Sequence, residues 1–338
     1  MSCLPVGKLS PDLLADLLRR YVRPDPRVVV GPGVGIDAAI LPLDEQRCLV
    51  AKTDPVTYAT ERIGWYAVHV SANDVACCGA VPCWFLATVL LPEAKATERL
   101  VRSIFSQVSQ ACLQLDVAWC GGHTEVVPGL ARPIVVGQML GEVARDGWLT
   151  AAKAQSGDAL ILTKGIAIEG TALIAREKRE ELDGVLPAAD LQRCAGLLDT
   201  PGISVVPDAR IALEVGGVHA LHDPTEGGVA GGLWELAQAS RLGIVVDEQQ
   251  LAILPECKAL CRHYDLDPLG LIASGSLLIA AQEDRAGLIA GRLRAEGIAA
   301  AKIGHLVPAE EGCMLQVAGR PSRPLPTFAR DEIARLFP

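Results

Sequence analysis

The chain is poor in aromatic and charged side chains, which make up 4% and 21% of its 338 residues. It has no run of about 20 apolar residues, the length that a membrane-spanning helix needs, so no membrane partner is predicted. The start of the chain lacks a cationic segment followed by an apolar one, so the sequence predicts a cytoplasmic protein without a leader. A formal charge of -9 and the lack of a basic, aromatic-rich patch argue against a nucleic-acid partner.

Several short signatures are missing as well. The sequence contains neither the lysine-containing loop of P-loop proteins nor the Gly-x-Gly-x-x-Gly fingerprint of dinucleotide-binding proteins. No Cys-x-x-Cys pair occurs among the 11 cysteines, which we interpret as reduced, buried thiols. A zinc site is the open alternative for five residues whose spacing matches no standard pattern: Cys77, Cys78, Cys83, Cys120 and His123.

Half of the residues are hydrophobic, and with so few aromatics the core must consist mainly of alanine, valine, leucine and isoleucine. This composition, with strands and helices alternating along the chain, is typical of an α/β protein. A chain of this length has room for two domains. The composition turns polar between residues 144 and 157, so we expect a first domain at residues 1–150 and a second at residues 151–338.

Hydrophobic periodicity and turn residues place the expected elements. In the first half, strands are expected at residues 28–30, 38–41, 48–52, 84–91, 117–120 and 133–143, and helices at 9–21, 64–79 and 95–115. In the second half, strands are expected at residues 158–163, 218–222, 244–246, 277–280 and 301–306, and helices from 168 and 226 onward and at 254–264 and 284–297.

The stretch of residues 64–80 is nearly all small or apolar, with Asn73 and Asp74 in its middle. Trp65 and Val75 belong to an apolar set with helical spacing, which predicts a buried helix. An ionised aspartate is costly in such a place unless a cation or a hydrogen-bond donor compensates it. Two interpretations stay open, because the pair either caps a neighbouring turn or lets Asp74 ligate a hard metal ion.

Other acidic residues accompany Asp74 in short motifs of the first half. Asp37 follows a glycine-rich turn, Asp54 ends a predicted strand, and Glu125 closes a predicted turn that begins at Gly121. Hard divalent ions such as Mg²⁺ prefer oxygen ligands, and neighbouring glycines let backbone amides approach phosphates closely. The set predicts a site for a magnesium nucleotide, although each aspartate alone is also a common turn residue.

Five segments, in their order and spacing, resemble the PurM superfamily: GVGIDAAI at residues 33–40, NDVACCGAVP at 73–82, GGHTEVVPG at 121–129, HDPTEGGVA at 222–230 and ASGSLL at 273–278. The superfamily includes AIR synthetase, selenophosphate synthetase, thiamine-phosphate kinase and the hydrogenase-maturation protein HypE, to which the last two segments are similar. The resemblance covers about residues 30–310. The combination is specific for the superfamily and not for one reaction.

The resemblance implies an ATP-using homodimer with Mg²⁺, in which the sheets of the two N-terminal domains pair into a barrel. The nucleotide and metal residues that it implies for the first domain are Asp37, Asp54, Asn73, Asp74, Gly121, Gly122 and Thr124. The family usually has an acidic residue after the glycine pair, where this chain has His123, a poorer Mg²⁺ ligand. Glu125 is the expected substitute as a metal ligand; otherwise the site binds the metal more weakly. The alternative role for His123 itself is that of a hydrogen-bonding loop residue.

The second domain offers six candidate site residues: Lys164, His222, Asp223, Thr225, Gly227 and Gly228. The last three begin a predicted helix, whose N-terminus is a natural anion site for part of the nucleotide or for the acceptor. The histidine and the aspartate are candidate catalytic groups, the histidine as a general base, and the lysine is a candidate phosphate contact. The alternative is that these residues have purely structural roles, as helix caps or at the end of a strand.

These observations predict an ATP-dependent phosphoryl-transfer or oxygen-activating enzyme. Its acceptor, a small molecule or a protein, is not defined by any motif. HypE proteins end in a cysteine that receives a carbamoyl group, whereas this sequence has no cysteine after Cys313, so that reaction is not expected in its usual form. The alternative function is a nucleotide-binding accessory protein with reduced catalysis.

Overall fold

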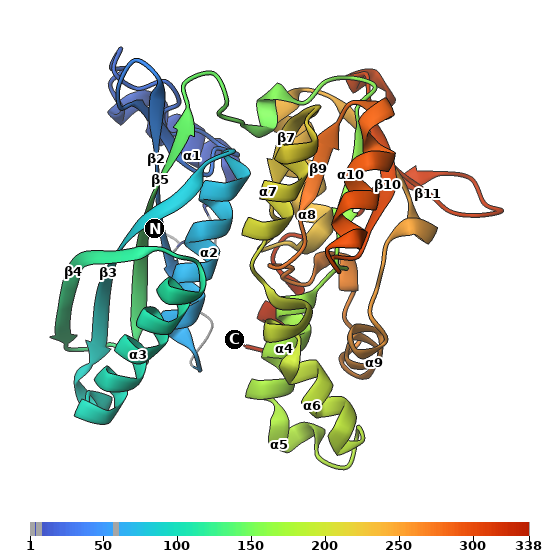
Figure 1. Cartoon of the computed structure of the whole chain (residues 1–338). Helices are drawn as coiled ribbons and strands as arrows, with labels where there is room; N and C mark the ends of the chain where they lie inside the picture. The colour runs from blue at the N-terminus through green and yellow to red at the C-terminus, as the bar shows by residue number, and fades with distance from the viewer. Residues whose placement is uncertain (1–3, 5–8, 57–60, 338) are drawn as a thin grey trace.

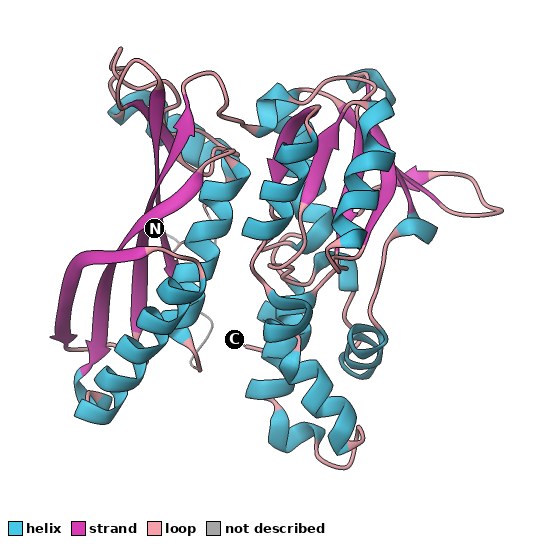
Figure 2. Cartoon of the chain, viewed as in Figure 1, coloured by secondary structure: helices cyan, strands magenta, loops and turns pink. Residues whose placement is uncertain are grey.

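The computed structural model describes residues 4, 9–56 and 61–337 and shows two α/β domains side by side (Figure 1). Each domain is built on one sheet with helices packed against it (Figure 2). Helix α1 (Pro11–Tyr21) precedes the first sheet, and the Ser10 hydroxyl caps it by accepting a hydrogen bond from the Leu13 amide. The fold class is therefore the mixed α/β, two-domain architecture that the sequence predicts.

The first sheet has five strands in the order β1-β2-β5-β3-β4. Their bounds are β1 Ala39–Pro42, β2 Arg47–Val56, β3 Val81–Pro92, β4 Ala118–Val127 and β5 Ile134–Ala144. Strands β3 and β4 are parallel, and the other neighbours are antiparallel. Helices α2 (Ile63–Cys77) and α3 (Glu98–Gln114) pack on one face of this sheet.

Helix α2 lies close to the sheet because strand β5 carries glycines where the two meet. A Cβ atom built on Gly137 would lie 2.6 Å from the Ser71 hydroxyl oxygen, and one on Gly141 would overlap with the Val75 side chain. Any larger residue there would push the helix away from the sheet. Asp74 lies in the sequence between Ser71 and Val75. The close approach of the helix to the sheet therefore fixes how far Asp74 is from the neighbouring strand β2.

The other face of the first sheet carries apolar side chains that are only half-buried, including Leu86, Leu90, Val136 and Leu140. Strands β1 and β4 form the two edges, so within the described part of one chain the sheet is open. The expected barrel is therefore not closed by a single chain. An open apolar face is a surface that a further layer would cover.

The second sheet has seven strands in the order β12-β11-β8-β10-β6-β9-β7. Their bounds are β6 Ala159–Thr163, β7 Val218–His222, β8 Gly243–Asp247, β9 Leu278–Ala281, β10 Ala300–Val307, β11 Cys313–Gln316 and β12 Arg323–Pro324. The helices of this domain are α4 Ile168–Glu177, α5 Arg179–Leu182, α6 Ala188–Gly196, α7 Val206–Val215, α8 Gly228–Ser240, α9 Pro255–Tyr264 and α10 Glu283–Ala295. Strand β7 is the edge nearest to the first domain in Figure 1.

One hydrophobic core joins the two domains. Val68 and Ala72 of helix α2 belong to the same buried cluster as Ile168, Leu198 and Ile203 of the second domain. This explains why nearly every residue of α2 is buried, since the sheet covers one side of the helix and the second domain covers the other. The interface therefore holds the polar residues of α2 away from bulk water.

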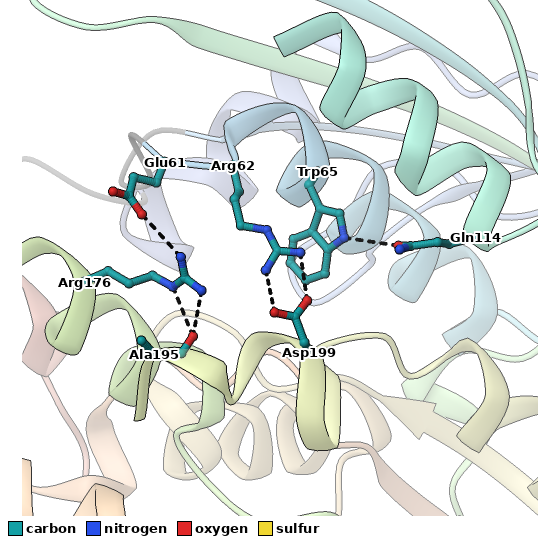
Figure 3. A network of polar contacts seen from close by, with 7 residues as sticks. All are labelled: Glu61, Arg62, Trp65, Gln114, Arg176, Ala195 and Asp199. Carbon is teal, nitrogen blue, oxygen red and sulfur yellow. Dashed lines mark hydrogen bonds and ion pairs between the residues drawn. The ribbon is translucent and has the colours of Figure 1, made fainter. Parts of the chain in front are cut away.

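A polar network lies at one end of this interface (Figure 3). The Arg62 guanidinium donates two hydrogen bonds of 2.9 Å to the Asp199 carboxylate of the second domain. Arg176 of helix α4 donates to Glu61 at 3.3 Å and to a carbonyl oxygen of helix α6 at 2.8 Å. Partly exposed pairs of this kind contribute about 0–1 kcal/mol each, so they orient the domains more than they stabilise them.

The expected strands and helices are present with shifted ends, apart from two differences. Val28–Val30 is not a strand, because only Val30 forms an isolated bridge, to Ile40. The predicted turn at residues 121–125 is wrong, because strand β4 runs through it in register with β3. None of the described helices combines the length and apolar character needed to span a lipid bilayer.

Candidate active site

Strand β2 and helix α2 face each other with opposite charges. Lys52 and Asp54 lie on the side of β2 on which Cys48 is buried. The Lys52 Nζ atom is 3.0 Å from Asp74 Oδ2, and the two side chains are 14% and 7% exposed. Burial opposes the ammonium charge, but attraction by Asp74, Asp54 and Asp37 exceeds this effect and raises the pKa of Lys52. Lys52 is therefore a fixed positive charge between the strand and the helix.

His222, at the end of strand β7, is held by two carboxylates. Its Nε2 atom is 2.9 Å from Glu235 Oε2 of helix α8, and its Nδ1 atom is 3.5 Å from Asp37 Oδ2. Burial lowers the pKa of His222, but Asp37 and Glu235 outweigh it, and the net pKa lies well above the usual value. The two carboxylates favour the protonated form of the ring, which suits an electrostatic role.

Asp223 has the properties that the base role requires. It is 2% exposed, and its Oδ1 atom accepts a hydrogen bond of 3.3 Å from the Cys77 thiol. Its Oδ2 atom has no hydrogen-bond partner among the described residues. Burial and the nearby Asp37 raise the pKa of Asp223 to about 7. A carboxyl group that titrates near neutral pH can accept a proton and later release it.

A narrow cavity beside these groups is lined by both domains, including Asp37, Cys77 and Cys78 of the first and Leu221 of the second. It has room for no more than about one water molecule. A larger ligand must therefore reach the cluster from the side of Asp37 and Asp54, which are partly exposed.

The predicted metal ligands do not come together as a set. Among the described residues no group of three or more His, Cys, Asp or Glu side chains is placed to hold a metal ion. Glu125 lies on strand β4, at the far edge of the sheet, and Lys52 occupies the space beside Asp74. The arrangement does not fit a Mg²⁺ ion held by the protein alone. It does not fit the zinc alternative either, since Cys120 is exposed on β4 while Cys77 bonds to Asp223.

The glycine motif of strand β4 is separated from the aspartate cluster by the width of the sheet. Asp54 of β2 pairs with Gly137 of β5, which pairs with Ala87 of β3. Ala87 in turn pairs with Gly122 of β4. Three strand spacings correspond to about 14 Å. Four predicted site residues therefore lie away from the cluster within one chain, and all are exposed: Gly121, Gly122, Thr124 and Glu125. Glu125 pairs with His123 at 3.5 Å instead.

Asn73 caps a neighbouring turn of the second domain, as one of the two open interpretations has it, and does not face the nucleotide route. Its side-chain nitrogen donates to the Ile203 carbonyl oxygen at 2.8 Å, and its side-chain oxygen accepts from the Val205 amide at 2.8 Å. The residue is completely buried. Both ends of the amide therefore bind the backbone of the second domain, and they join helix α2 to the residues before helix α7. This is a structural clamp rather than a nucleotide contact.

Lys164 also differs from its predicted role as a phosphate contact. Its ammonium lies 3.0 Å from Asp208 Oδ2 and donates a hydrogen bond of 2.6 Å to the Ser204 carbonyl oxygen. The lysine and aspartate side chains are 4% and 1% exposed. Burial lowers the pKa of Lys164, and the Asp208 carboxylate opposes this effect. The Lys164 ammonium is therefore paired with groups inside the protein and does not face a ligand.

One amide at the N-terminus of helix α8, that of the N-cap residue Gly227, binds the chain's own Asp331 carboxylate. The Gly227 amide donates to Asp331 Oδ2 at 2.6 Å, and the Ile272 amide donates to the other oxygen at 3.2 Å. Thr225 forms the turn before the helix, its carbonyl oxygen accepting from the Gly228 amide. At the predicted anion site of Thr225, Gly227 and Gly228, the Gly227 amide therefore binds the Asp331 carboxylate.

Three residues that shape this site were not predicted from the sequence: Lys52, Glu235 and Asp331. The position of Lys52 could have been predicted, because it follows Cys48 by four residues and so lies on the same, buried side of the strand. A lysine in that position needs a carboxylate partner. Glu235 and Asp331 had no such signal, since their contacts with His222 and Gly227 depend on the tertiary fold.

Glu169 near the start of helix α4 provides a prediction for pH dependence. Burial raises its pKa from 4.5 to about 7. Between these values the unfolded carboxyl is ionised and the folded one is protonated, so the folded state binds more protons and stability falls as pH rises. Wild type should lose on the order of 1–3 kcal/mol through this group between pH 5 and pH 8.

The Glu169→Gln variant removes this titration, so its stability should fall less over the same interval in urea denaturation. Asp223 remains in both proteins, and the difference between the two proteins reports Glu169 together with its repulsion from Asp331. Glu310→Gln, at an exposed position, is the matched control and should follow wild type. An unchanged pH dependence in Glu169→Gln would contradict the prediction.

The fold and the site define a two-domain α/β protein with a charged cluster between its domains. Residues 35–143 match the family model of the AIR synthase related protein, N-terminal domain, and residues 155–314 match that of the AIR synthase related protein, C-terminal domain. The chain belongs to the AIR synthase related family of the PurM superfamily and is HypE-like.

Three relatives define the range of this similarity. The carbamoyl dehydratase HypE of Rhizobium leguminosarum bv. viciae is 32% identical over 259 residues, 75% of this chain and 70% of the relative. The selenide, water dikinase of Rhizobium meliloti (strain 1021) is 31% identical over 282 residues, 80% of this chain and 73% of the relative. A solved structure of the hydrogenase maturation protein HypE in complex with ATP is 26% identical and has a TM-score of 0.72, covering 97% of both chains.

Proposed function

We propose that this chain is an ATP-dependent enzyme of the AIR synthase/HypE type that activates an oxygen of its acceptor by phosphoryl transfer. The observation that carries the proposal is the charged cluster between the domains, where Lys52 and Asp74 of the first domain meet His222 and Asp223 of the second. The HypE relative that binds ATP supports it, because that protein aligns with 97% of this chain. The acceptor is a small molecule or a protein group with a nucleophilic oxygen.

In this proposal the phosphates of ATP enter from the partly exposed side of Asp37 and Asp54. The Lys52 ammonium and the His222 imidazolium provide positive charge at the inner end of this route. Mg²⁺ belongs to the proposal as the ion that accompanies the ATP phosphates, because the described side chains do not form a site for it. The contribution of the protein is positioning and charge neutralisation.

Asp223 takes the proton in the chemical step. The acceptor oxygen attacks the γ-phosphorus of ATP, its O–H bond breaks, and its proton passes to the Asp223 carboxylate. The bond between the γ-phosphorus and the bridging oxygen breaks, and ADP leaves with the electron pair. A pKa of about 7 suits a group that must be ionised before this step and must release the proton after it.

We also propose a homodimer in which the open faces of the first sheets pair into a barrel. The half-buried apolar residues of these faces, such as Leu86, Val136 and Leu140, support this arrangement, as does the unpaired edge strand β4. The dimer would place the glycine motif of β4 against the partner chain. Light scattering that gives twice the mass of 35.6 kDa supports the dimer, and a monomer contradicts it.

A nucleotide-binding accessory protein with reduced catalysis is the second candidate. The contact of the Gly227 amide with Asp331 and the remote position of the β4 motif favour it, because both remove expected phosphate contacts. Such a protein would bind ATP and release no phosphate with any acceptor. The enzyme would release phosphate or ADP once its acceptor is supplied.

The test is calorimetric titration of ATP, with and without Mg²⁺, into wild type and Asp54→Asn. Wild type should bind ATP in a Mg²⁺-dependent manner, and Asp54→Asn should bind about 10- to 100-fold more weakly, because in this proposal the Asp54 carboxylate attracts the Mg²⁺ ion that accompanies the phosphates. Asp284→Asn is the matched control, because it removes an exposed carboxylate at the start of helix α10, away from the cluster. Equal affinities in all three proteins would contradict the site, and no binding to wild type would contradict the function. An assay of ADP formation with added hydroxyl acceptors on the same samples separates the two candidates, because the proposed transfer forms ADP and the accessory protein forms none.

A further inference from the structure

Helix α2 contacts the second domain through two polar side chains one turn apart. Asn73 binds the backbone at Ile203 and Val205. Four residues later, the thiol of Cys77 donates a hydrogen bond of 3.3 Å to Oδ1 of Asp223, which follows strand β7. Residues four apart lie on the same face of a helix, so the clamp at Asn73 also determines where Cys77 meets the second domain.

The Cys77 thiol is the hydrogen-bond donor in this contact. Burial and the neighbouring Asp223 carboxylate raise the pKa of the thiol well above its usual value, so the sulfur keeps its proton at neutral pH. A thiol carries one hydrogen, so it binds one carboxylate oxygen. The other oxygen of Asp223, Oδ2, is buried and has no hydrogen-bond partner among the described residues. The two oxygens of this carboxylate therefore have different surroundings.

A thiol suits this position better than a stronger donor would. Hydrogen bonds to an ionised carboxylate lower its pKa, and a charged donor has the largest effect. Burial and Asp37 raise the pKa of Asp223 to about 7, and the attraction of His222 and the contact with Cys77 oppose them only in part. A weak donor thus orients the carboxylate and leaves it basic enough to take a proton near neutral pH.

We propose that Cys77 is a positioning residue for Asp223: its thiol holds Oδ1, so that Oδ2 is the oxygen that takes the proton of the acceptor. The inference rests on the proposed function, in which Asp223 is the base. It joins the base of the second domain to a helix of the first, so the base is held only while the two domains are docked. Cys77 forms no bond to the substrate and keeps its proton throughout the reaction.

The infrared band of the S–H stretch tests the contact in protein without ATP, because this vibration falls in frequency when the thiol donates a hydrogen bond. The Cys77 band is identified as the one that Cys77→Ala lacks. It should move to higher frequency in Asp223→Ala, which removes the acceptor. If that variant does not fold, Asp223→Asn offers a weaker, neutral acceptor and should shift the band in the same direction.

Cys112 provides the control for the infrared measurement, because its thiol is also buried in the first domain but lies on helix α3. Its band, identified in the same way from Cys112→Ala, should keep its frequency in the Asp223 variants. A Cys77 band with the same frequency in the presence and absence of the Asp223 carboxylate would overturn the inference.

ADP formation tests the positioning, with the hydroxyl acceptor that gives the fastest turnover in wild type. Cys77→Ala should form ADP about 10- to 100-fold more slowly than wild type, because its Asp223 carboxylate is no longer held in place. The affinity of Cys77→Ala for ATP in calorimetry should be unchanged. Cys77→Ser keeps a donor and should recover most of the rate. Cys112→Ala, the matched loss of a buried thiol, should form ADP at the wild-type rate.

Two results of this assay would contradict the positioning role: a Cys77→Ala rate equal to that of wild type, or a loss that Cys77→Ser does not recover. A wild type that forms no ADP with any acceptor contradicts the proposed function instead. The S–H band then decides by itself whether Cys77 holds Asp223, so the two failures are distinguishable.

Discussion

Replacing Lys164 with methionine is expected to lower the free energy of unfolding by about 3–5 kcal/mol. The variant removes the ammonium that lies 3.0 Å from Asp208 and leaves that carboxylate charged and buried. It also removes the hydrogen bond to the Ser204 carbonyl oxygen. An uncompensated buried charge costs far more than the loss of an exposed ion pair, which is worth about 0–1 kcal/mol. Urea denaturation of the two proteins measures the difference.

The double variant Lys164→Met, Asp208→Leu tests the reason for this loss. It removes both charges at once, so most of the lost stability should return, to within about 1–2 kcal/mol of wild type. Lys302→Met is the matched control, since Lys302 forms an exposed pair with Glu283. If Lys164→Met behaves like Lys302→Met, the buried pair does not support the fold. A lysine that served only to bind phosphate would give that result.

The sequence was sufficient for the fold wherever a pattern is local. Helix α2 was predicted from apolar residues at helical spacing, and the structure places it at Ile63–Cys77. The alternation of apolar strands and helices predicted two α/β domains. The motifs around Asp37 and Asp74 predicted acidic residues that converge, and the structure brings both of them close to Lys52. The elements depend on residues near one another in the chain, whereas the convergence of Asp37 with Asp74 was expected from the combination of motifs.

The site was predicted less well because its contacts join distant parts of the chain. A glycine pair is typical of a turn, yet Gly121 and Gly122 continue a strand, because after an irregularity at Cys120 they pair with Leu86 and Ala87 of β3. Lys164 and Asp208 are far apart in the sequence, and nothing near either residue identifies the other as its partner. The same holds for Gly227 and Asp331, so a free helix N-terminus was predicted where a carboxylate closes it.

Replacing Asn73 with alanine is expected to destabilise the protein by about 2–5 kcal/mol. The substitution leaves the Ile203 carbonyl and the Val205 amide without their 2.8 Å partners at a buried interface. Each unsatisfied buried group costs about 1–3 kcal/mol, and the two costs fall on the contact between the domains. Urea denaturation at pH 8 measures the loss. A variant within about 1 kcal/mol of wild type would contradict the structural role.

Asn73→Asp separates this clamp from a nucleotide contact. A carboxylate at position 73 still accepts from the Val205 amide, but it donates to the Ile203 carbonyl oxygen only when it is protonated. Burial next to Asp74 raises the pKa of such a group, and a raised folded pKa means that the protonated form stabilises the fold. The deficit of Asn73→Asp relative to wild type should therefore shrink at pH 5 and grow at pH 8, whereas that of Asn73→Ala should be the same at both. A residue that acts on ATP alone would show neither deficit, because both are measured without nucleotide.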